Sequence, residues 1–406
     1  MSSNYPNFRS SVPWLIFFLE VVFIVLFQFL FTGDGVSRSS ISYPAFQDVS
    51  HMVIFGFGFF LTFLKRYGFS STGFNLLIVA LGVQCSVLID LLVFFHQRQD
   101  EDDLKRITKA SVSMTAVVIS TGAVLGKANP LQLILMTVVE IIVFHTSRWI
   151  NKTFLEVPDN ISMMYVPLFG AYFGVAAASR FSEPPPRSEK NASTPQSDLL
   201  SMLGTLFLWV FWPSFNSVLA VNDKSKAIFN TYFAIAASAV TAFVLSALIT
   251  EDGKFRMAHI RSAVLAGGVA VGYAAHSIEY PWIAMVLGLL AAVVTILGSC
   301  CVQRCLNATF KIRDTAGTHF TFGLPGVLGA LAQVVLLVMK NWTDLPRLSY
   351  LVIIEVGTFC LTISVALITG FITGLILNLK LFKTIPVSKH FDDQFCWEFP
   401  RLAVGF

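Results

Sequence analysis

Twelve apolar runs, each long enough to cross a membrane as a helix, constrain the fold of this 406-residue chain more than any other feature. A helix needs about 20 mostly apolar residues to cross a hydrocarbon layer of about 30 Å. The chain is 55% hydrophobic and 13% charged, whereas roughly 25% of residues are charged in an ordinary soluble domain. The sequence therefore predicts an all-α polytopic membrane protein with twelve transmembrane helices. The predicted helices cover residues 13–33, 48–64, 74–95, 109–127, 130–147, 160–181, 199–220, 227–250, 262–279, 282–303, 317–338 and 350–379.

The distribution of Lys and Arg predicts the side of the membrane on which the termini lie. An even number of helices places both termini on the same side. The termini and the five loops on their side contain 17 of the 28 Lys and Arg residues. Because loops rich in Lys and Arg remain in the cytoplasm, both termini are predicted to be cytoplasmic.

The polar stretch between the sixth and seventh helices divides the chain into two halves. Residues 183–198, EPPPRSEKNASTPQSD, are rich in Pro and Ser and cannot bury a core. This composition predicts a flexible cytoplasmic linker. A single transmembrane domain then spans residues 1–406, with a first half at 13–181, a second half at 199–379 and a cytoplasmic tail at 380–406.

The two halves show a weak internal similarity. Asp159 opens the sixth predicted helix as Asp314 opens the eleventh, and small residues follow in both (FGAYFGVAAAS and FGLPGVLGALA). If helices two to six repeat as helices seven to eleven, the unit has five helices, an odd number, so the second unit is inverted. Inverted repeats generally place a solute site near the midplane where they meet. The pattern predicts an inverted five-helix repeat.

The stretch from Asp314 to Ala330, DTAGTHFTFGLPGVLGA, places a titratable side chain inside the eleventh predicted helix. An imidazole in the hydrocarbon region is costly, so it usually faces a protein-lined cavity and marks a solute pathway. His319 is therefore a candidate pathway residue. The alternative is a structural histidine that hydrogen-bonds a neighbouring helix.

The seventh predicted helix combines a proline with bulky aromatic residues in the run WVFWPSFNS. Pro213 frees a backbone carbonyl, which a membrane helix tolerates where other groups or a cavity compensate. Phe215, followed by Asn216, is a candidate for a hydrophobic constriction that gates by excluding water. Alternatively, Phe215 only packs against its neighbours, as is common in a chain with 39 Phe residues.

The remaining polar residues inside the predicted helices have a structural interpretation. An acid at the centre of a membrane helix costs about 2.5–3.5 kcal/mol on insertion scales. Glu20 and Glu140 are the most centred, and we expect both to hydrogen-bond other helices or subunits rather than to carry solute. The others are His51, Asp90, His145 and His276, several of which lie near helix ends.

The cysteines and the charge balance exclude several classes of function. Most of the six cysteines lie in or beside apolar runs, which indicates free buried thiols. Cys300, Cys301 and Cys305, at a helix end beside basic residues, are candidates for palmitoylation. His and Cys residues show no metal-ligand spacing, and no nucleophile accompanies His319, so neither a metal, a cofactor nor an enzymatic activity is predicted. A net charge of +4 spread over the chain gives no case for nucleic-acid binding.

Several uninterrupted runs carry a resemblance that extends nearly end to end. They are GAVLGKANPLQL (122–133), FGAYFG (169–174), GTLFLWVFWPSFNS (204–217), FNTYFAIAASAVTA (229–242) and SAVLAGGVAVG (262–272). In this order they resemble the Rh branch of the ammonium transporter family. The opening MSSNYP and the final run FDDQFCWEFPRLAVGF (391–406) look closest to the Rh blood-group polypeptides of the RhD/RhCE type.

The resemblance implies a trimer of twelve-helix subunits, each with a narrow and mostly apolar pore for ammonia or ammonium. Family members that conduct use paired pore histidines, a phenylalanine gate and an acid at the start of one helix. On this chain the acid matches Asp159, the inner gate Phe215 and the histidine of the Asp-x-x-Gly-x-His motif His319. The position of the other histidine, two residues before FGAYFG, is occupied by Pro167.

The sequence departs from the family pattern at two places. Two imidazoles in contact can share a proton and offer both a donor and an acceptor, whereas proline has no side-chain polar group and no backbone N–H. Without its partner, His319 needs another acceptor or water, at a penalty of about 1–3 kcal/mol if it finds none. In addition, no phenylalanine occurs from Gln97 to Ile142, so the outer gate expected on the fourth helix is absent.

Two functions remain open at this point. The first is a channel for neutral ammonia or a similar small gas, indicated by Asp159, Phe215 and His319. The second is a structural subunit, itself weakly conducting, of an oligomeric complex in the red-cell plasma membrane. The resemblance implies for that complex a homo- or hetero-trimer with an Rh-associated glycoprotein, and attachment to an ankyrin-type membrane skeleton. The departures at Pro167 and on the fourth helix favour the second function.

Overall fold

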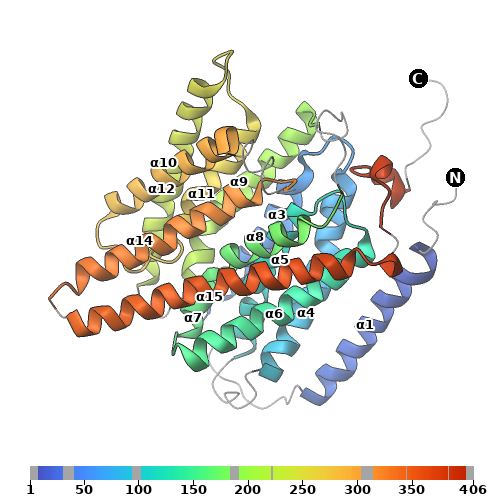
Figure 1. Ribbon diagram of the computed structural model, residues 1–406, viewed down its shortest axis with the longest axis horizontal. Coiled ribbons are helices and arrows are strands. Elements are labelled where there is room, and N and C mark those ends of the chain that lie inside the picture. Colours follow the sequence, from blue (N-terminus) through green and yellow to red (C-terminus); the bar gives the residue numbers. More distant parts are fainter. Residues whose placement is uncertain are drawn as a thin grey trace.

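The computed structural model describes residues 8–30, 41–93, 102–182, 192–220, 223–302, 314–343, 345–382 and 384–398, which are all helix, turn or loop. Twelve membrane-crossing segments occur within these residues (Figure 1). The predicted class, an all-α membrane protein with twelve transmembrane helices, is confirmed. Ten segments are long and apolar enough to cross a membrane by composition alone. The other two are α5 and α11.

The first segment is α1 (Phe8–Leu30). The second segment consists of four consecutive pieces: α2 (Tyr43–His51), η1 (Met52–Gly56), α3 (Phe57–Phe60) and η2 (Leu61–Phe63). Then come α4 (Gly68–Val93), α5 (Asp103–Ala123) and α6 (Pro130–Phe154). The sixth segment consists of α7 (Asp159–Ser162), η4 (Met163–Tyr165) and α8 (Val166–Ala178).

The second six segments begin with α9 (Pro195–Ser217), α10 (Lys224–Ile249) and α11 (Met257–Val271). The tenth segment is α12 (Pro281–Leu297) with η6 (Gly298–Val302), and the eleventh is η7 (His319–Gly323) with α14 (Leu324–Lys340). The last is α15 (Leu345–Leu377). Three short turns follow in the tail: η8 (Lys380–Phe382), η9 (Val387–Lys389) and η10 (Asp393–Phe395).

The start of α9 differs from the predicted linker boundary. Residues 183–191 of the linker lie outside the described residues, and α9 begins at Pro195 rather than after Asp198. The side chain of Thr194 accepts a hydrogen bond from the Ser197 backbone, and the Ser197 side chain accepts one from the Thr194 backbone. This capping box, followed by proline at the first helical position, starts the helix one turn earlier than hydropathy indicates.

Helix α5 is the most polar of the twelve segments because it lies at the centre of the bundle rather than against lipid. Every residue from Thr108 to Ala123 is buried. Two glycines of α8 let the two backbones approach closely, since an added Cβ at Gly170 or Gly174 would lie 2.3 Å from Ala116 O or 2.6 Å from Ser120 Cα. Small residues at such contacts are typical of membrane helix pairs.

The packing of the helices follows the predicted repeat. Helix α4 packs against α5 and α6, as α10 packs against α11 and α12 in the second half. Likewise, α5 packs against α8 as α11 packs against α14. The second and seventh segments, which are the first of each unit, contact each other through α3 and α9. The five-helix unit therefore occurs twice, and its odd number of helices inverts the second copy.

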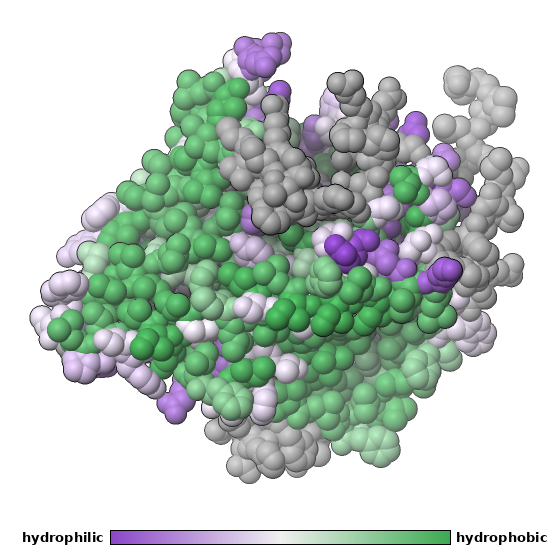
Figure 2. All heavy atoms as spheres, viewed as in Figure 1, coloured by the Kyte–Doolittle hydropathy of each residue, from purple (hydrophilic) through white to green (hydrophobic). Residues whose placement is uncertain are grey.

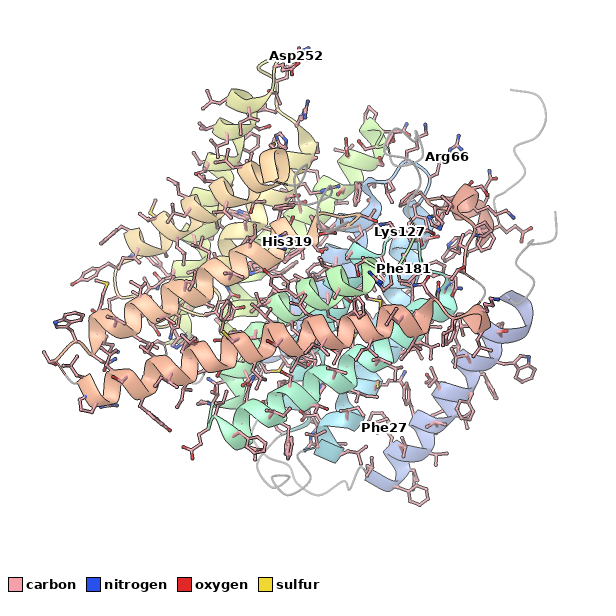
Figure 3. The ribbon with its side chains drawn as sticks, in the orientation of Figure 1. Phe27, Arg66, Lys127, Phe181, Asp252 and His319 are labelled. Atoms are coloured by element: carbon pink, nitrogen blue, oxygen red, sulfur yellow. The ribbon has the colours of Figure 1, made fainter. Side chains whose placement is uncertain are left out.

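The described parts of the loops predicted to share one side lie on the same side of the bundle. Arg66, Lys127, Phe181 and Asp252 lie toward one side of the bundle, and Phe27 lies toward the other (Figure 3). We refer to the side of Arg66 and Asp252 as the inner side and to the opposite side as the outer side. Figure 2 shows a broad apolar face over α14 and α15, with the most hydrophilic residues mainly at its margins. Such a face suits contact with lipid.

Candidate functional site

A cavity of about 330 Å³ opens at the outer ends of five segments. It is lined by polar residues from the sixth, seventh, eighth, ninth and eleventh segments and from the loops beside them. They are Asn160, Asn216, Asp223, Lys226, Tyr273, His276, Ser277, Glu279 and Lys340, with Ile161, Met164, Ala220 and Gly272 between them. In this outer cavity two carboxylates, Asp223 and Glu279, face two ammonium groups, Lys226 and Lys340, so the wall carries no strong net charge when His276 is neutral.

Asn216 is fixed at the inner end of this cavity by two hydrogen bonds. Its side-chain amide donates to Gly268 O at 2.9 Å and to Thr231 Oγ1 at 3.2 Å. Gly272 packs beside it, where an added Cβ would lie 3.2 Å from Asn216 Oδ1. Asn216 is thus held in place by α10 and α11, and it is one of the cavity-lining residues.

Directly inward of Asn216 lies a cluster of five buried aromatic side chains. Phe215 contacts Trp212 with ring centroids 5.7 Å apart, and Trp212 stacks on Phe322 at 6.3 Å with an interplanar angle of 15°. Phe57 and Phe60 complete the cluster, at 5.9 Å and 6.1 Å from Phe322. Each of the five is at most 1% exposed. We call this set the aromatic cluster.

Two local features allow the aromatic cluster to form. Gly268 leaves room for the indole, because an added Cβ would lie 2.6 Å from Trp212 Cδ1. Phe322 lies in the π-helical turn η7. A π-helical turn contains one residue more than an α-helical turn, so it rotates the side chains that follow it around the helix axis. The cluster draws its rings from the second, seventh and eleventh segments, so it lies where the two repeats meet.

His319 lies one helical turn inward of Phe322. Its backbone N–H donates to Asp314 Oδ2 at 2.8 Å, and its ring contacts Tyr172 and Phe320 at centroid distances of 5.8 Å and 4.9 Å. The side chain is half-buried, and among the described residues its buried Nδ1 has no hydrogen-bond partner. The described side chains therefore do not supply the second partner that His319 needs in place of a paired imidazole.

Pro167 is buried at the second position of α8. At this end of the helix a proline removes no intrahelical hydrogen bond, because the N–H it lacks would be unpaired. Gly326 of α14 packs against Leu168, the residue that follows Pro167. A Cβ added at Gly323 of η7 would lie 3.5 Å from the Cβ of Ala171. Helices α8 and α14 therefore meet closely through small and apolar groups at this level.

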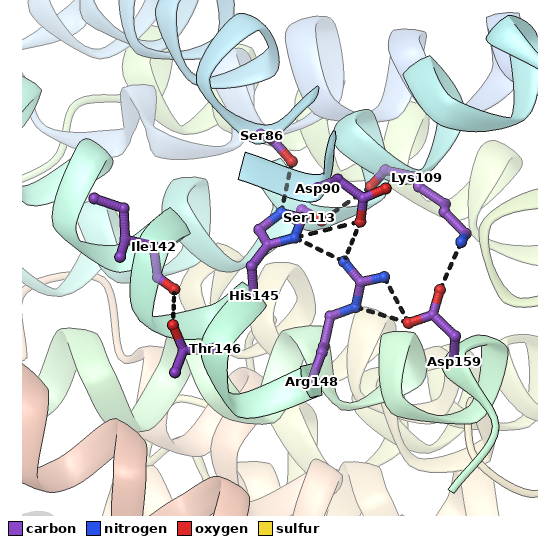
Figure 4. A network of polar contacts seen from close by, with 9 residues as sticks. All are labelled: Ser86, Asp90, Lys109, Ser113, Ile142, His145, Thr146, Arg148 and Asp159. Carbon is purple, nitrogen blue, oxygen red and sulfur yellow. Dashed lines mark hydrogen bonds and ion pairs between the residues drawn. The ribbon is translucent and has the colours of Figure 1, made fainter. Parts of the chain in front are cut away.

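Asp159 is part of a buried ionic network and is not among the residues that line the outer cavity (Figure 4). Its carboxylate accepts from Arg148 at 2.6 Å and from Lys109 Nζ at 2.6 Å. Arg148 also pairs with Asp90 at 3.3 Å. Two cations thus offset two carboxylates within the low-dielectric interior, which leaves Asp159 without spare negative charge for a passing cation.

His145 completes the network. Arg148 has only N–H donors, so at 2.9 Å it donates to Nδ1 of His145. The opposite ring nitrogen, Nε2, lies 2.8 Å from Ser86 Oγ and therefore carries the proton that it donates to the hydroxyl. His145 thus bridges α4 and α6, and its Nδ1 also lies 3.5 Å from Asp90 Oδ1 (Figure 4).

The sequence analysis did not predict the network because its fourth helix begins at Lys109 and its fifth ends before Arg148, which places both cations at helix ends. In the structure α5 begins at Asp103 and α6 continues to Phe154, so both side chains are inside helices and at most 8% exposed. Arg148 and Asp159 are eleven residues apart and are separated by a helix break, so no helical periodicity in the sequence indicates that they pair.

The two centred acids hydrogen-bond other helices, as predicted. Glu20 of α1 accepts from Gln84 of α4 at 3.1 Å. Glu140 of α6 accepts from the Ser120 hydroxyl of α5 and is fully buried. Both residues therefore join neighbouring helices within the chain.

Of the three cysteines predicted to be palmitoylated, only Cys300 has a described side chain. It is half-buried, with Sγ 3.4 Å from His259 Nε2 of α11. The side chain of Cys301 and all of Cys305 lie outside the described residues. Palmitoylation at the three positions stays a prediction.

Comparison with known proteins gives a consistent result. The model of the Ammonium Transporter Family matches residues 12–393. The chain is 42% identical to the Blood group Rh(D) polypeptide of Rattus norvegicus and 41% identical to an RH-like protein of Macaca mulatta, each over the full length of both chains. The fold of the chain is similar to the solved structure of Nitrosomonas europaea Rh50, with a TM-score of 0.74. That structure was described together with the mechanism of conduction by the Rhesus protein family of channels. That alignment has 29% identity and covers 89% of this chain and 92% of the other.

The fold and the site define a polytopic membrane protein with an outer cavity that leads to a narrow aromatic constriction between two inverted repeats. Proteins of this architecture form solute channels and transporters. The chain belongs to the ammonium transporter family, and its full-length similarity places it with the Rh proteins.

Proposed function

We propose that this chain is an Rh-type subunit of an oligomeric complex in the red-cell plasma membrane and that it conducts ammonia weakly or not at all. The aromatic cluster is the observation that carries the proposal. Phe215, Trp212 and Phe322 close the route inward from the outer cavity with rings that are at most 1% exposed. A packed apolar constriction excludes water and the solutes that travel with it.

The polar groups that flank the cluster support the same function. A solute hydrogen-bonded at Asn216 would have to cross three rings before it reached His319. Beyond the rings, His319 offers one unpartnered nitrogen, and Pro167 supplies no second imidazole. The chain therefore lacks the shared-proton relay that two adjacent histidines would form.

Charge compensation at Asp159 also argues against strong recruitment of ammonium. Both carboxylate oxygens are engaged by Arg148 and Lys109. An acid with two cations within hydrogen-bond distance has little attraction left for a third. The mixed charge of the outer cavity adds no further pull.

The proposed complex is a homo- or hetero-trimer in which an Rh-associated glycoprotein supplies the transport activity. The apolar outer faces of the chain support multi-pass insertion. The tail and the start of α1 lie on the same side of the bundle, and the excess of Lys and Arg on that side supports cytoplasmic termini. The cytoplasmic tail would then be available to an ankyrin-type membrane skeleton.

The alternative is a competent channel for ammonia or another small neutral gas. The outer cavity and the unpartnered His319 Nδ1, one on each side of the aromatic cluster, favour it. A neutral molecule of three or four atoms needs only transient separation of the rings.

Ammonia permeability of proteoliposomes that contain this chain alone distinguishes the two functions. The internal alkalinisation rate after an ammonia pulse should equal that of protein-free liposomes of the same lipid. A rate well above that background would contradict the structural function. Reconstituted Rh50 from Nitrosomonas europaea serves as the positive control.

A further inference from the structure

A second cavity, of about 590 Å³, lies at the inner side of the bundle and is separate from the solute pathway. It is bounded by the inner ends of α3, η2, α4 and α9 and by the tail turn η10. Its residues are Phe59, Thr62, Lys65, Arg66, Gly68, Phe69, Thr72, Leu200, Asp392, Asp393 and Gln394. Figure 3 shows Arg66 on this side, close to the tail. We call it the inner cavity.

The tail wall of the inner cavity is built into the fold. Asp393 accepts hydrogen bonds from the backbone N–H groups of Phe69 at 2.9 Å and Ser70 at 2.8 Å, and so caps α4. Its own N–H donates to Arg66 O at 2.8 Å. Trp397 donates to Ser70 Oγ at 2.9 Å and packs on Phe69. The carboxylate of Asp393 is therefore already used by the protein.

Two cations and one acid in the cavity remain available to a ligand. Lys65 and Arg66 are exposed, and within the described residues neither is in an ion pair. Asp392 is half-exposed on the tail-side wall, and its Oδ1 accepts a hydrogen bond from the Gln394 backbone at 3.1 Å. The cavity lining thus combines two cations with one carboxylate.

Part of the cavity lining is apolar. Phe69 is 55% exposed and Leu200 is 44% exposed, and Phe59 also lines the cavity. All three residues lie near the ends of segments long enough to cross the membrane. A ligand in this cavity therefore has charged groups of both signs for its polar part and apolar side chains for its hydrocarbon part.

We propose that the inner cavity binds a phospholipid whose headgroup carries both a phosphate and a primary ammonium, such as phosphatidylethanolamine. The phosphate pairs with Lys65 and Arg66, because guanidinium and ammonium groups are the usual partners of phosphate. The lipid ammonium donates to Asp392, and the acyl chains lie along Phe69 and Leu200. A quaternary amine has no N–H to donate, so phosphatidylcholine satisfies only half of the site.

Lipid binding to the purified full chain tests the proposal, measured by native mass spectrometry with four dioleoyl lipids. Phosphatidylethanolamine carries both groups, phosphatidic acid only the phosphate, phosphatidylcholine a phosphate without an N–H donor, and diacylglycerol neither. The first should bind most tightly, with about threefold weaker binding for each lost charge-assisted contact at an exposed site. Diacylglycerol should bind most weakly.

Two variants separate the two walls. The double variant Lys65→Gln, Arg66→Gln should weaken the binding of phosphatidylethanolamine and of phosphatidic acid to the same extent. Asp392→Asn keeps the Oδ1 acceptor for Gln394. It should weaken the binding of phosphatidylethanolamine only, and it should strengthen the binding of phosphatidic acid because the repulsion between the Asp392 carboxylate and the phosphate is removed. The matched control, Asp252→Asn with Lys254→Gln, changes the same kinds of charge on a distant inner loop and should change nothing (Figure 3).

Two outcomes would overturn the proposal. Equal binding of phosphatidylethanolamine and phosphatidylcholine, insensitive to the variants, would show ordinary annular lipid. Weaker phosphatidic acid binding in the Lys65 and Arg66 variant, with phosphatidylethanolamine unaffected by Asp392→Asn, would show a basic patch without an amine subsite. All the changed side chains are at least partly exposed, so loss of fold does not explain either result.

Discussion

The indole of Trp212 and the ring of Phe322 lie stacked at the centre of the bundle, with centroids 6.3 Å apart and planes 15° from parallel. One residue comes from the seventh segment and the other from the eleventh, so the contact joins the two repeats. Both side chains are at most 1% exposed, and they lie between Asn216, which lines the outer cavity, and His319. The aromatic cluster therefore packs the two repeats together, and under the proposed function it also closes the route to His319.

The stack requires a glycine at residue 268. In Gly268→Ala the new Cβ would lie 2.6 Å from Trp212 Cδ1. We expect overpacking to cost about 1–3 kcal/mol and to lower the unfolding temperature in detergent. Gly68→Ala is the control, since no heavy atom lies within 4 Å of the added Cβ. Equal unfolding temperatures for both variants would show that Trp212 moves freely.

The ionic network should be sensitive to the loss of one member. Arg148→Ala leaves Asp90 and Asp159 buried with fewer cations, and breaking a buried pair in this way costs about 3–5 kcal/mol. We expect a large fall in the unfolding temperature and in the yield of folded protein. Combining Arg148→Met with Asp159→Asn removes the uncompensated charge and should recover much of the loss. A double variant no more stable than Arg148→Ala would contradict the charge argument.

The docked tail depends on a glycine in α4. A Cβ at Gly73 would lie 2.2 Å from the Trp397 ring, so Gly73→Ala should displace the tail. Trypsin cleavage after Lys389 should then become faster than in the unmodified chain. Substitution of Glu398, which is exposed, should leave the cleavage rate unchanged. Slow cleavage in Gly73→Ala would mean that the tail tolerates the change.

Cys396 should report the same displacement through its pH dependence. Burial, together with the nearby Asp393 carboxylate, raises the pKa of the Cys396 thiol to about 12. The thiolate is the reactive form, so alkylation in the docked state should be slow at pH 8 and should rise steadily toward pH 12. In Gly73→Ala the pKa should fall toward its ordinary value, and the rate at pH 8 should increase at least tenfold. Mass spectrometry of the tail peptide measures both rates.

Much of the fold could be predicted from hydropathy, because apolar runs define membrane segments almost independently of tertiary contacts. Segment boundaries were less accurate. The Thr194–Ser197 capping box extends α9, and buried charges extend α5 and α6 past Lys109 and Arg148. Hydropathy alone cannot identify a charged residue that is inside the bundle and paired.

The site was predicted in part. Asn216 was expected in the pathway and lines the outer cavity, and Phe215 belongs to the constriction beside it. Phe322, which stacks on Trp212, gave no signal among 39 Phe residues because its role depends on a contact between distant segments. The same holds for the partners of Asp159, which come from two other helices.

Ammonia flux through Phe322→Ala provides the most direct test of the account, measured by stopped-flow alkalinisation of proteoliposomes that contain no other protein. Removal of this ring opens a gap beside Trp212, so permeability should rise severalfold above that of the unmodified chain, which itself should match lipid alone. Phe229→Ala, a change of the same size on an exposed position of α10, should remain at background. High flux in the unmodified chain, unaffected by Phe322→Ala, would contradict closure by the aromatic cluster.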